Sequence, residues 1–213
     1  MQTFEDRNNH LFVQEKGKRG KAGKIRRMTN KNLLILGAGQ YGQVVKEIAE
    51  ETGCFDKISF LDDNSEQAIG KIDEYEDFVS EYSYAVVAIG NAELRLDYIQ
   101  KLEEACYRVA VLVSPRAYIS KSAQLMKGTI VEPMAVVNAN STVAIGVFVC
   151  AGAVVNHNAF IGDGCQLDCG SAVGSGVILK AKTKLRYNEV FDKDRAEIAL
   201  RRPPDGYKFE DGM

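Results

Sequence analysis

The feature that most restricts how this chain can fold is an aliphatic residue that returns every six positions from Ile119 to Leu185. Two positions before each of these residues the side chain is small or of modest size, as at Ala135 and Ala153. Side chains alternate between the two faces of a strand, so both positions point to one inward face. The glycines follow one or three places after the aliphatic residue, where freedom at positive φ suits a corner. The aliphatic series is Ile119, Leu125, Val131, Val137, Val143, Val149, Val155, Ile161, Leu167, Val173, Leu179 and Leu185.

This six-residue repeat is typical of a parallel β-helix. Each repeat supplies one short strand and one corner, and three repeats close one coil. We therefore expect a prism of about four coils over residues 114–187. Such a short stack buries little surface by itself, which favours a homotrimer or another homo-oligomer.

The preceding region, residues 31–113, alternates between apolar strand patterns and amphipathic helix patterns instead. Continuous apolar runs that end in glycine or carboxylates are typical of buried parallel strands. The region therefore predicts a small, Rossmann-like α/β domain built from βαβ units. The expected strands are NLLILGAG (32–39), KISFLDD (57–63), YAVVAIG (84–90) and RVAVLV (108–113), and the expected helices are QYGQVVKEIAEETG (40–53) and NAELRLDYIQKLEEAC (91–106).

Three glycines, Gly37, Gly39 and Gly42, form the segment GAGQYG between the first expected strand and helix. Glycine lets backbone approach a ligand closely, and a helix N-terminus offers N–H donors to a phosphate. Asp62 follows at the distance where a carboxylate meets a ribose hydroxyl. The motif indicates a nucleotide or phosphate site, and the alternative is a tight turn that binds nothing.

His157 is the only histidine outside the N-terminal leader, which contains His10. It comes two places after Val155, at the middle of an expected corner, so it lies outside both inward positions. A corner is where neighbouring prisms and ligands meet, which makes the imidazole a candidate acid–base group. A core histidine with satisfied hydrogen bonds is the alternative.

The composition excludes several classes of protein. A formal net charge of −2 and an isoelectric point near 5.8 do not favour binding to nucleic acid or to an anionic membrane. No apolar run approaches the roughly 18 residues of a membrane-spanning helix. The five cysteines lack the paired spacing of a metal site, so we expect reduced thiols, no metal and a cytoplasmic location.

The two ends of the chain differ from both repeating regions. The segment KGKRGKAGKIRR makes the N-terminal end strongly basic, and we expect a disordered leader there. After the hexads, FDKDRAEIALRRPPDG is expected to form a short helix that ends at Pro203 and Pro204. The expected organisation is a leader over 1–30, a nucleotide- or sugar-binding domain over 31–113, a β-helix over 114–187, and a helix and tail over 188–213.

Together with the glycine turn and the hexads, three segments resemble one known family. The chain resembles the bacterial sugar O- and N-acyltransferases that acetylate sialic acid or UDP-linked amino sugars. This resemblance implies a left-handed prism, a homotrimer, acetyl-CoA as acetyl donor, and a sugar or nucleotide sugar as acceptor. It also implies active sites between adjacent prisms. The segments are FLDDN (60–64), VAIGNAELR (87–95) and VVNHNAFIGDGC (154–165).

The resemblance also implies roles for individual residues. His157 matches the general base, with Asn158 beside it where the family usually has Glu or Asp. Gln166, where a second histidine is often found, and Gly170 as an oxyanion donor are expected to contact acetyl-CoA. Independently of the resemblance, the charge of Lys184 near the last coil suits the CoA phosphates, and a solvated edge that ends the β-stack is the alternative. Ser114 replaces a further histidine of the family. The residues expected to bind the acceptor are Gly37, Gly39, Gln40, Tyr41, Gly42, Asp62, Asp63, Gly90, Asn91 and Arg95.

Two other functions compete with this hypothesis. A non-catalytic relative would use the same pocket to bind a nucleotide sugar or to act as a scaffold, and Asn158 and Gln166 motivate that reading. An oxidoreductase or NAD sensor would rest on GAGQYG alone. A γ-type carbonic anhydrase shares the prism, but its zinc needs three histidines and this prism contains one.

Overall fold

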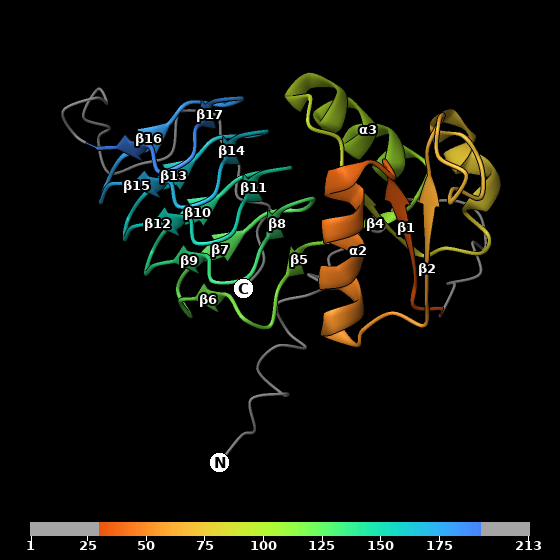
Figure 1. Cartoon of the computed structure of the whole chain (residues 1–213), viewed down its shortest axis with the longest axis horizontal. Coiled ribbons are helices and arrows are strands. Elements are labelled where there is room, and N and C mark those ends of the chain that lie inside the picture. The colour runs from red at the N-terminus through yellow and green to blue at the C-terminus, as the bar shows by residue number, and fades with distance from the viewer. Residues whose placement is uncertain (1–29, 193–213) are drawn as a thin grey trace, which may run out of the picture.

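The computed structural model describes residues 30–192 of the 213-residue chain. Figure 1 shows that they form an α/β domain followed by a prism of stacked short strands. The leader predicted for residues 1–30 lies outside the described residues except for Asn30, and so does the predicted C-terminal helix from residue 193. Within the described part of the chain, no helix has the length and apolar character needed to cross a bilayer.

The α/β domain contains one four-stranded parallel sheet with the order β2-β1-β3-β4. Chain order and spatial order diverge between β1 and β3, which makes their carboxyl ends a topological switch point where ligands bind in such sheets. The strands are β1 (Asn32–Leu36), β2 (Lys57–Leu61), β3 (Tyr84–Val87) and β4 (Arg108–Val109), and the helices are α2 (Gln40–Thr52), α3 (Ala92–Glu104) and the short 3-10 helix η1 (Ile72–Phe78).

The central strand β1 is apolar on both faces because both faces are covered. Leu33 and Ile35 pack in one hydrophobic cluster with residues of α2, whereas Leu34 and Leu36 pack in another with residues of α3. The predicted helices and first three strands are confirmed, with Gly53 ending α2 in a left-handed conformation. The short helix η1 was not predicted from the sequence.

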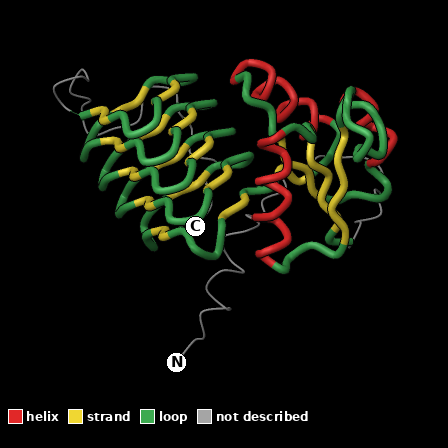
Figure 2. Tube along the Cα trace, in the orientation of Figure 1, coloured by secondary structure: helices red, strands yellow, loops and turns green. Residues whose placement is uncertain are grey.

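The second part is a left-handed parallel β-helix, as predicted, built from three sheets of two-residue strands (Figure 2). Strands three apart in the chain pair in parallel, so each coil contributes one strand to each sheet. The β5–β17 sheet contains β5 (Leu112–Val113), β8 (Ile130–Val131), β11 (Phe148–Val149), β14 (Gln166–Leu167) and β17 (Lys184–Leu185); the β6–β18 sheet contains β6 (Tyr118–Ile119), β9 (Val136–Val137), β12 (Val154–Val155), β15 (Ala172–Val173) and β18 (Val190–Phe191); the β7–β16 sheet contains β7 (Gln124–Leu125), β10 (Thr142–Val143), β13 (Phe160–Ile161) and β16 (Ile178–Leu179).

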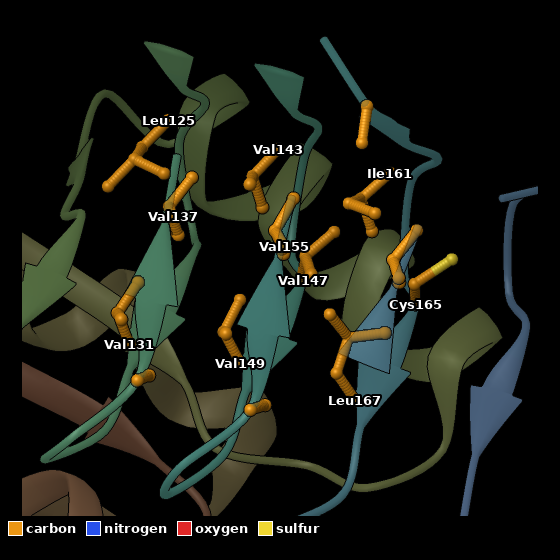
Figure 3. Packing of buried hydrophobic residues seen from close by; sticks show 14 of the residues in the cluster. Leu125, Val131, Val137, Val143, Val147, Val149, Val155, Ile161, Cys165 and Leu167 are labelled. Carbon is orange, nitrogen blue, oxygen red and sulfur yellow. The ribbon is translucent and has the colours of Figure 1, made fainter. Parts of the chain in front are cut away.

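The hexad residues point into the prism and form its core (Figure 3). From Leu125 to Leu185 each of them is at most 5% exposed, as the repeat predicts. The register extends further than the sequence analysis proposed, because Val113 and Phe191 continue it at the two ends. The single strand predicted over 108–113 is therefore two strands in different sheets, β4 and β5.

The third residue after each core position turns the chain, and its identity depends on what packs outside it. At Gly128, Gly146 and Gly164, φ lies between 64° and 71°, and a Cβ would meet side chains of α3. At Gly128 that Cβ would lie 2.6 Å from the Cδ1 of Ile99. Asn158 adopts φ of 57° at a corner that α3 does not cover, where asparagine tolerates the left-handed conformation. At Gly128, Gly146 and Gly164, glycine therefore leaves the room that α3 needs to pack on the prism.

The α/β domain covers one face of the prism. Outward residues of the β5–β17 sheet, Leu112, Ile130 and Phe148, join the same hydrophobic cluster as Ile35 of β1 and Val45 of α2. Figure 1 shows α2 lying against this sheet and α3 near the corner that precedes it. The other two sheets of the prism lie away from the α/β domain.

Candidate active site

The glycine-rich turn follows β1 at the switch point of the sheet. Gly37 has φ of 103° and donates its N–H to the carbonyl of Leu61 at 2.8 Å. A Cβ on Gly42 would lie 2.2 Å from the Gly37 carbonyl oxygen, so Gly42 permits the tight turn. Gly39 differs, because its φ of −66° suits any residue and a Cβ there would have nothing within 4 Å. The space beside Gly39 at the start of α2 is open to a ligand.

Asp62 holds this turn in place from the end of β2. Its carboxylate accepts hydrogen bonds from the N–H of Ala38 at 2.7 Å and of Asn64 at 2.9 Å. These backbone donors lower the pKa of Asp62, so the group is ionised at neutral pH. Asp63 is exposed and accepts a hydrogen bond from the N–H of Ile72 at 3.2 Å. Asp62 therefore lies on the rim of the glycine turn, and Asp63, the next residue, contacts the start of η1.

The end of β3 lies next to the same turn, since a Cβ on Gly37 would be 3.2 Å from the carbonyl oxygen of Ala88. A Cβ on Gly90 would meet open space, and Asn91 caps α3 by accepting the N–H of Leu94 at 3.0 Å. The switch point therefore brings together the glycine turn, the Asp62 rim and the Gly90–Asn91 segment, all predicted to bind the acceptor. Gln40, also predicted there, is exposed at the first residue of α2.

Two other residues predicted to contact the acceptor have partners elsewhere. Arg95 is fully buried and donates hydrogen bonds to four backbone carbonyls at the domain junction. The ring of Tyr41 packs on Phe148 of the prism, with a centroid distance of 4.5 Å. The sequence motifs correctly placed Arg95 and Tyr41 near the turns of the acceptor site. They could not show that the prism packs against both side chains, because no local pattern encodes that contact.

His157 is exposed at the corner between β12 and β13, as its register predicts. The backbone N–H of His157 donates to the side-chain oxygen of Asn156 at 2.8 Å, and its backbone carbonyl accepts the N–H of Gly176 at 3.0 Å. The ring Nδ1 lies 2.8 Å from the side-chain nitrogen of Asn158. The backbone is thus fixed by its neighbours and the ring by Asn158, while Nε2 has no hydrogen-bond partner among residues 30–192.

Within one chain, the His157 corner lies far from the glycine turn (Figure 1). The corner joins the β6–β18 and β7–β16 sheets, whereas the α/β domain packs on the β5–β17 sheet. A single chain therefore does not bring the imidazole to the site predicted for the acceptor.

The residues predicted to contact acetyl-CoA lie near one end of the β5–β17 sheet. Gln166 and Lys184 are paired on adjacent strands, and both contact Asp168, at 2.6 Å and 3.4 Å respectively. The sequence analysis did not predict Asp168 as a site residue. Its position directly after the core residue Leu167, at the start of a corner, could have indicated it. Gly170 is exposed, but its N–H donates to the carbonyl of Ala151 at 3.0 Å. This N–H is part of the corner ladder and is not a free donor for an oxyanion.

Thiol chemistry does not offer an alternative nucleophile in the core. Burial raises the pKa of Cys165 to about 11 and raises that of Cys150 further, so both thiols are protonated at neutral pH. Among the residues that the structure describes, no group of three or more His, Cys, Asp or Glu is arranged to hold a metal ion.

Comparisons with known proteins agree with the resemblance seen in the motifs. Residues 32–102 match the PglD N-terminal domain family. The acetyltransferase domain of PglB from Neisseria gonorrhoeae FA1090 is 26% identical over 80% of this chain and 100% of that one, with a TM-score of 0.66. These two matches support a bacterial sugar acetyltransferase family for this chain. The resemblance in its motifs is therefore confirmed, because the match extends through both the α/β domain and the prism.

More distant structures share the fold. The same PglB domain in complex with acetyl coenzyme A matches with 24% identity over 80% of this chain and 100% of that one, at a TM-score of 0.50. A mutant of perosamine N-acetyltransferase from Caulobacter crescentus, in complex with CoA and GDP-perosamine, matches with 19% identity over 79% and 97% of the two chains, at a TM-score of 0.54. A search of the curated proteins finds no relative.

Proposed function

We propose that this family member transfers the acetyl group of acetyl-CoA to an amino or hydroxyl group of a nucleotide-activated sugar, with His157 as general base. The observation that carries the proposal is an exposed imidazole whose Nδ1 is held by Asn158 while Nε2 is free. Nε2 takes the proton of the acceptor as the acceptor's nitrogen or oxygen attacks the thioester carbonyl. The carbon–sulfur bond then breaks, and the CoA thiolate leaves with the proton from the imidazolium.

Asn158 can support either tautomer of the His157 ring. A base at Nε2 requires the proton on Nδ1, which then donates to the side-chain oxygen of Asn158. The two ends of an amide exchange by rotation, so asparagine supports this tautomer as well as the opposite one. Its oxygen carries no full charge, so it stabilises the imidazolium less than the family's usual carboxylate does.

The oxyanion donor is better assigned to Ser175 than to Gly170. Ser175 occupies the corner position equivalent to His157, one coil further on, where β15 pairs with β12. The N–H of the following residue, Gly176, already bonds to the carbonyl of His157. The N–H of Ser175 has no acceptor among residues 30–192, so it is a preorganised donor beside the imidazole. Such donors stabilise the developing charge in acyl transfer.

The two substrates are divided between the two parts of the chain. The nucleotide of the acceptor binds at the glycine turn, with its phosphates at the N-terminus of α2 near Gly39 and its ribose or base at Asp62 and Asp63. Acetyl-CoA lies along the prism, where Gln166 offers a hydrogen bond and Lys184 a positive charge. We assign the reaction to the cytoplasm, where the five cysteines stay reduced.

A homotrimer brings these two sites together. The outward face of the β6–β18 sheet is apolar along its whole length, and its end residues Tyr118 and Val190 are 59% and 51% exposed. In the trimer, three copies bury this face around a common axis. The His157 corner of one copy then lies beside its neighbour, at the corner of the neighbour's prism that is next to the neighbour's α/β domain. The imidazole then faces a neighbour's acceptor. The outward residues are Tyr118, Val136, Val154, Ala172 and Val190.

The test of the function is a transfer assay. Purified protein is incubated with acetyl-CoA and a panel of UDP- and GDP-linked sugars with and without a free amino group, and CoA release is followed. Acetylated product identified by mass spectrometry supports the proposal. Binding of a nucleotide sugar by calorimetry without any transfer favours the scaffold hypothesis, and binding of NAD alone favours the oxidoreductase hypothesis.

Gly39→Val tests the division between the substrates. The new side chain enters the open space at the start of α2 without strain, where it excludes a phosphate. We expect the KM for the acceptor to rise by about tenfold or more, with the KM for acetyl-CoA unchanged. Gly42→Val is the contrasting variant, because its Cβ clashes with the Gly37 carbonyl and disturbs the whole domain. Equal effects of Gly39→Val on both substrates would contradict the assignment.

Asn158→Asp tests how the imidazole is supported. A carboxylate beside Nδ1 accepts its proton in one tautomer only and stabilises the imidazolium. We expect kcat to rise above about pH 7 and the acidic limb of the pH–rate profile to move to higher pH. Asn140→Asp is the matched control, since Asn140 is also exposed with φ of 58° but follows Ala139. A pH profile that moves equally in both variants would show a general charge effect instead.

A further inference from the structure

The buried guanidinium of Arg95 lies where the turn after β3, part of the predicted acceptor site, meets the prism. Arg95 belongs to the first turn of α3 and is 0% exposed. Its NH1 donates to the carbonyls of Ile89 and Gly90, at 2.7 Å and 3.1 Å. These carbonyls belong to the turn that follows β3, so the two hydrogen bonds of Arg95 hold that turn in place.

The other side of the guanidinium binds the prism. Nε donates to the carbonyl of Gly146 and NH2 to that of Gly164, both at 2.7 Å. These two glycines occupy equivalent corners of consecutive coils, both in the left-handed conformation. One planar fork therefore joins two coils of the prism to the α/β domain. Only arginine offers enough fixed donors for this arrangement, because a lysine ammonium has three donors and no planar fork.

An aromatic side chain of the prism connects Arg95 to the glycine turn. The guanidinium carbon lies 3.9 Å from the ring centroid of Phe148, which is 1% exposed on β11. The ring of Tyr41, from the GAGQYG segment, packs on the same ring at 4.5 Å. Tyr41 of the glycine turn therefore contacts Phe148 directly, and the turn after β3 is connected to Phe148 through Arg95. We call Arg95, Phe148 and Tyr41 the junction cluster.

The charge of Arg95 is costly to bury, which argues for a specific role. Among residues 30–192 no salt bridge involves Arg95, so its partners are carbonyl dipoles and a ring face. Burial lowers the pKa of Arg95 to about 10, and the group stays protonated at neutral pH. If this junction served packing alone, a leucine could fill it without the cost of desolvating a charge.

We propose that Arg95 is a positioning residue, which through the junction cluster holds the acceptor-binding turns at a fixed distance from the prism of its own chain, and thereby from the neighbour's His157 in the proposed trimer. This inference rests on the proposed function. Acyl transfer requires the acceptor atom within reach of the thioester, and a misplacement of about 1 Å costs about 100-fold in rate. Neither Arg95 nor Phe148 needs to touch a substrate for this effect.

The test compares Arg95→Lys and Arg95→Met with Arg108→Met. Arg108 is a matched control because its guanidinium also lies over an aromatic ring, that of Tyr84, but within the α/β domain. We expect Arg95→Lys to lower kcat by about 10- to 100-fold with the KM for acetyl-CoA unchanged. We expect the wild type to unfold in a single calorimetric transition and Arg95→Met to unfold in two, one for each part of the chain.

Failure of the positioning role can be distinguished from failure of the proposed acetyl transfer. Wild-type kcat in Arg95→Lys, or an equal loss of kcat in Arg108→Met, overturns the positioning role. A rise in the KM for acetyl-CoA equal to the fall in kcat also overturns it, because that pattern indicates general damage. If the wild type transfers no acetyl group, the proposed function fails, and a single unchanged transition in Arg95→Met overturns the junction as well.

Discussion

His157→Ala is expected to lower kcat by about 10²–10⁴-fold, the usual contribution of a general base. The affinity for acetyl-CoA should change little, because the residues proposed to bind CoA lie on another sheet. The physical reason is that the variant leaves no group at the corner to take the acceptor's proton. Initial rates over a range of pH, with both substrates varied, measure the effect and separate kcat from KM.

Stability provides the counter-check on that result. The side chain of His157 is exposed and outside the core, so its removal should leave the melting temperature nearly unchanged. Lys121→Ala is the matched control, since Lys121 is exposed at the equivalent corner position two coils away. Undiminished turnover in His157→Ala would refute the base, and a large loss of stability without a kinetic defect would make the imidazole structural.

The prism could be predicted from the sequence because each short strand buries its own hexad residue, so the signal repeats without reference to distant contacts. The predicted hexad series was too short at both ends, where the neighbouring sequence suggested a different element. Val113 ends an apolar run that looked like one strand of the α/β domain, and Phe191 is aromatic where the series is aliphatic. Packing, not local pattern, decides how both residues are used.

The arrangement of the candidate site depends on contacts that local sequence does not encode. Arg95 is 51 and 69 residues from the two glycines it binds, Gly146 and Gly164. A usable signal was nevertheless present, because glycine recurs at 128, 146 and 164 while asparagine or a larger residue stands at several other corners. Glycine at every third corner indicates a surface in close contact with something else. Such a column identifies the face of the prism that the α/β domain covers.

The separation of His157 from the glycine turn makes activity depend on assembly, and Val154→Glu tests this. Val154 points outward at the centre of the apolar β6–β18 face, while Val155 points into the core. Burying an unpaired carboxylate in each copy costs several kcal/mol, more than a small interface supplies. We expect light scattering to show a fall from three times the 23.5 kDa chain mass to one, and transfer to fall by about 100-fold or more.

Gln124→Glu is the control for that prediction, because Gln124 is exposed and points outward on β7, in a sheet that the proposed trimer does not bury. It should remain trimeric and active. A wild-type protein that is a stable monomer with full activity would contradict the shared site, since one chain keeps its imidazole away from its own glycine turn. If Val154→Glu stays trimeric, another face forms the interface. If instead it becomes monomeric and acetyl-CoA still binds while transfer is lost, the defect lies in completing the site, because the neighbour that carries the acceptor is missing.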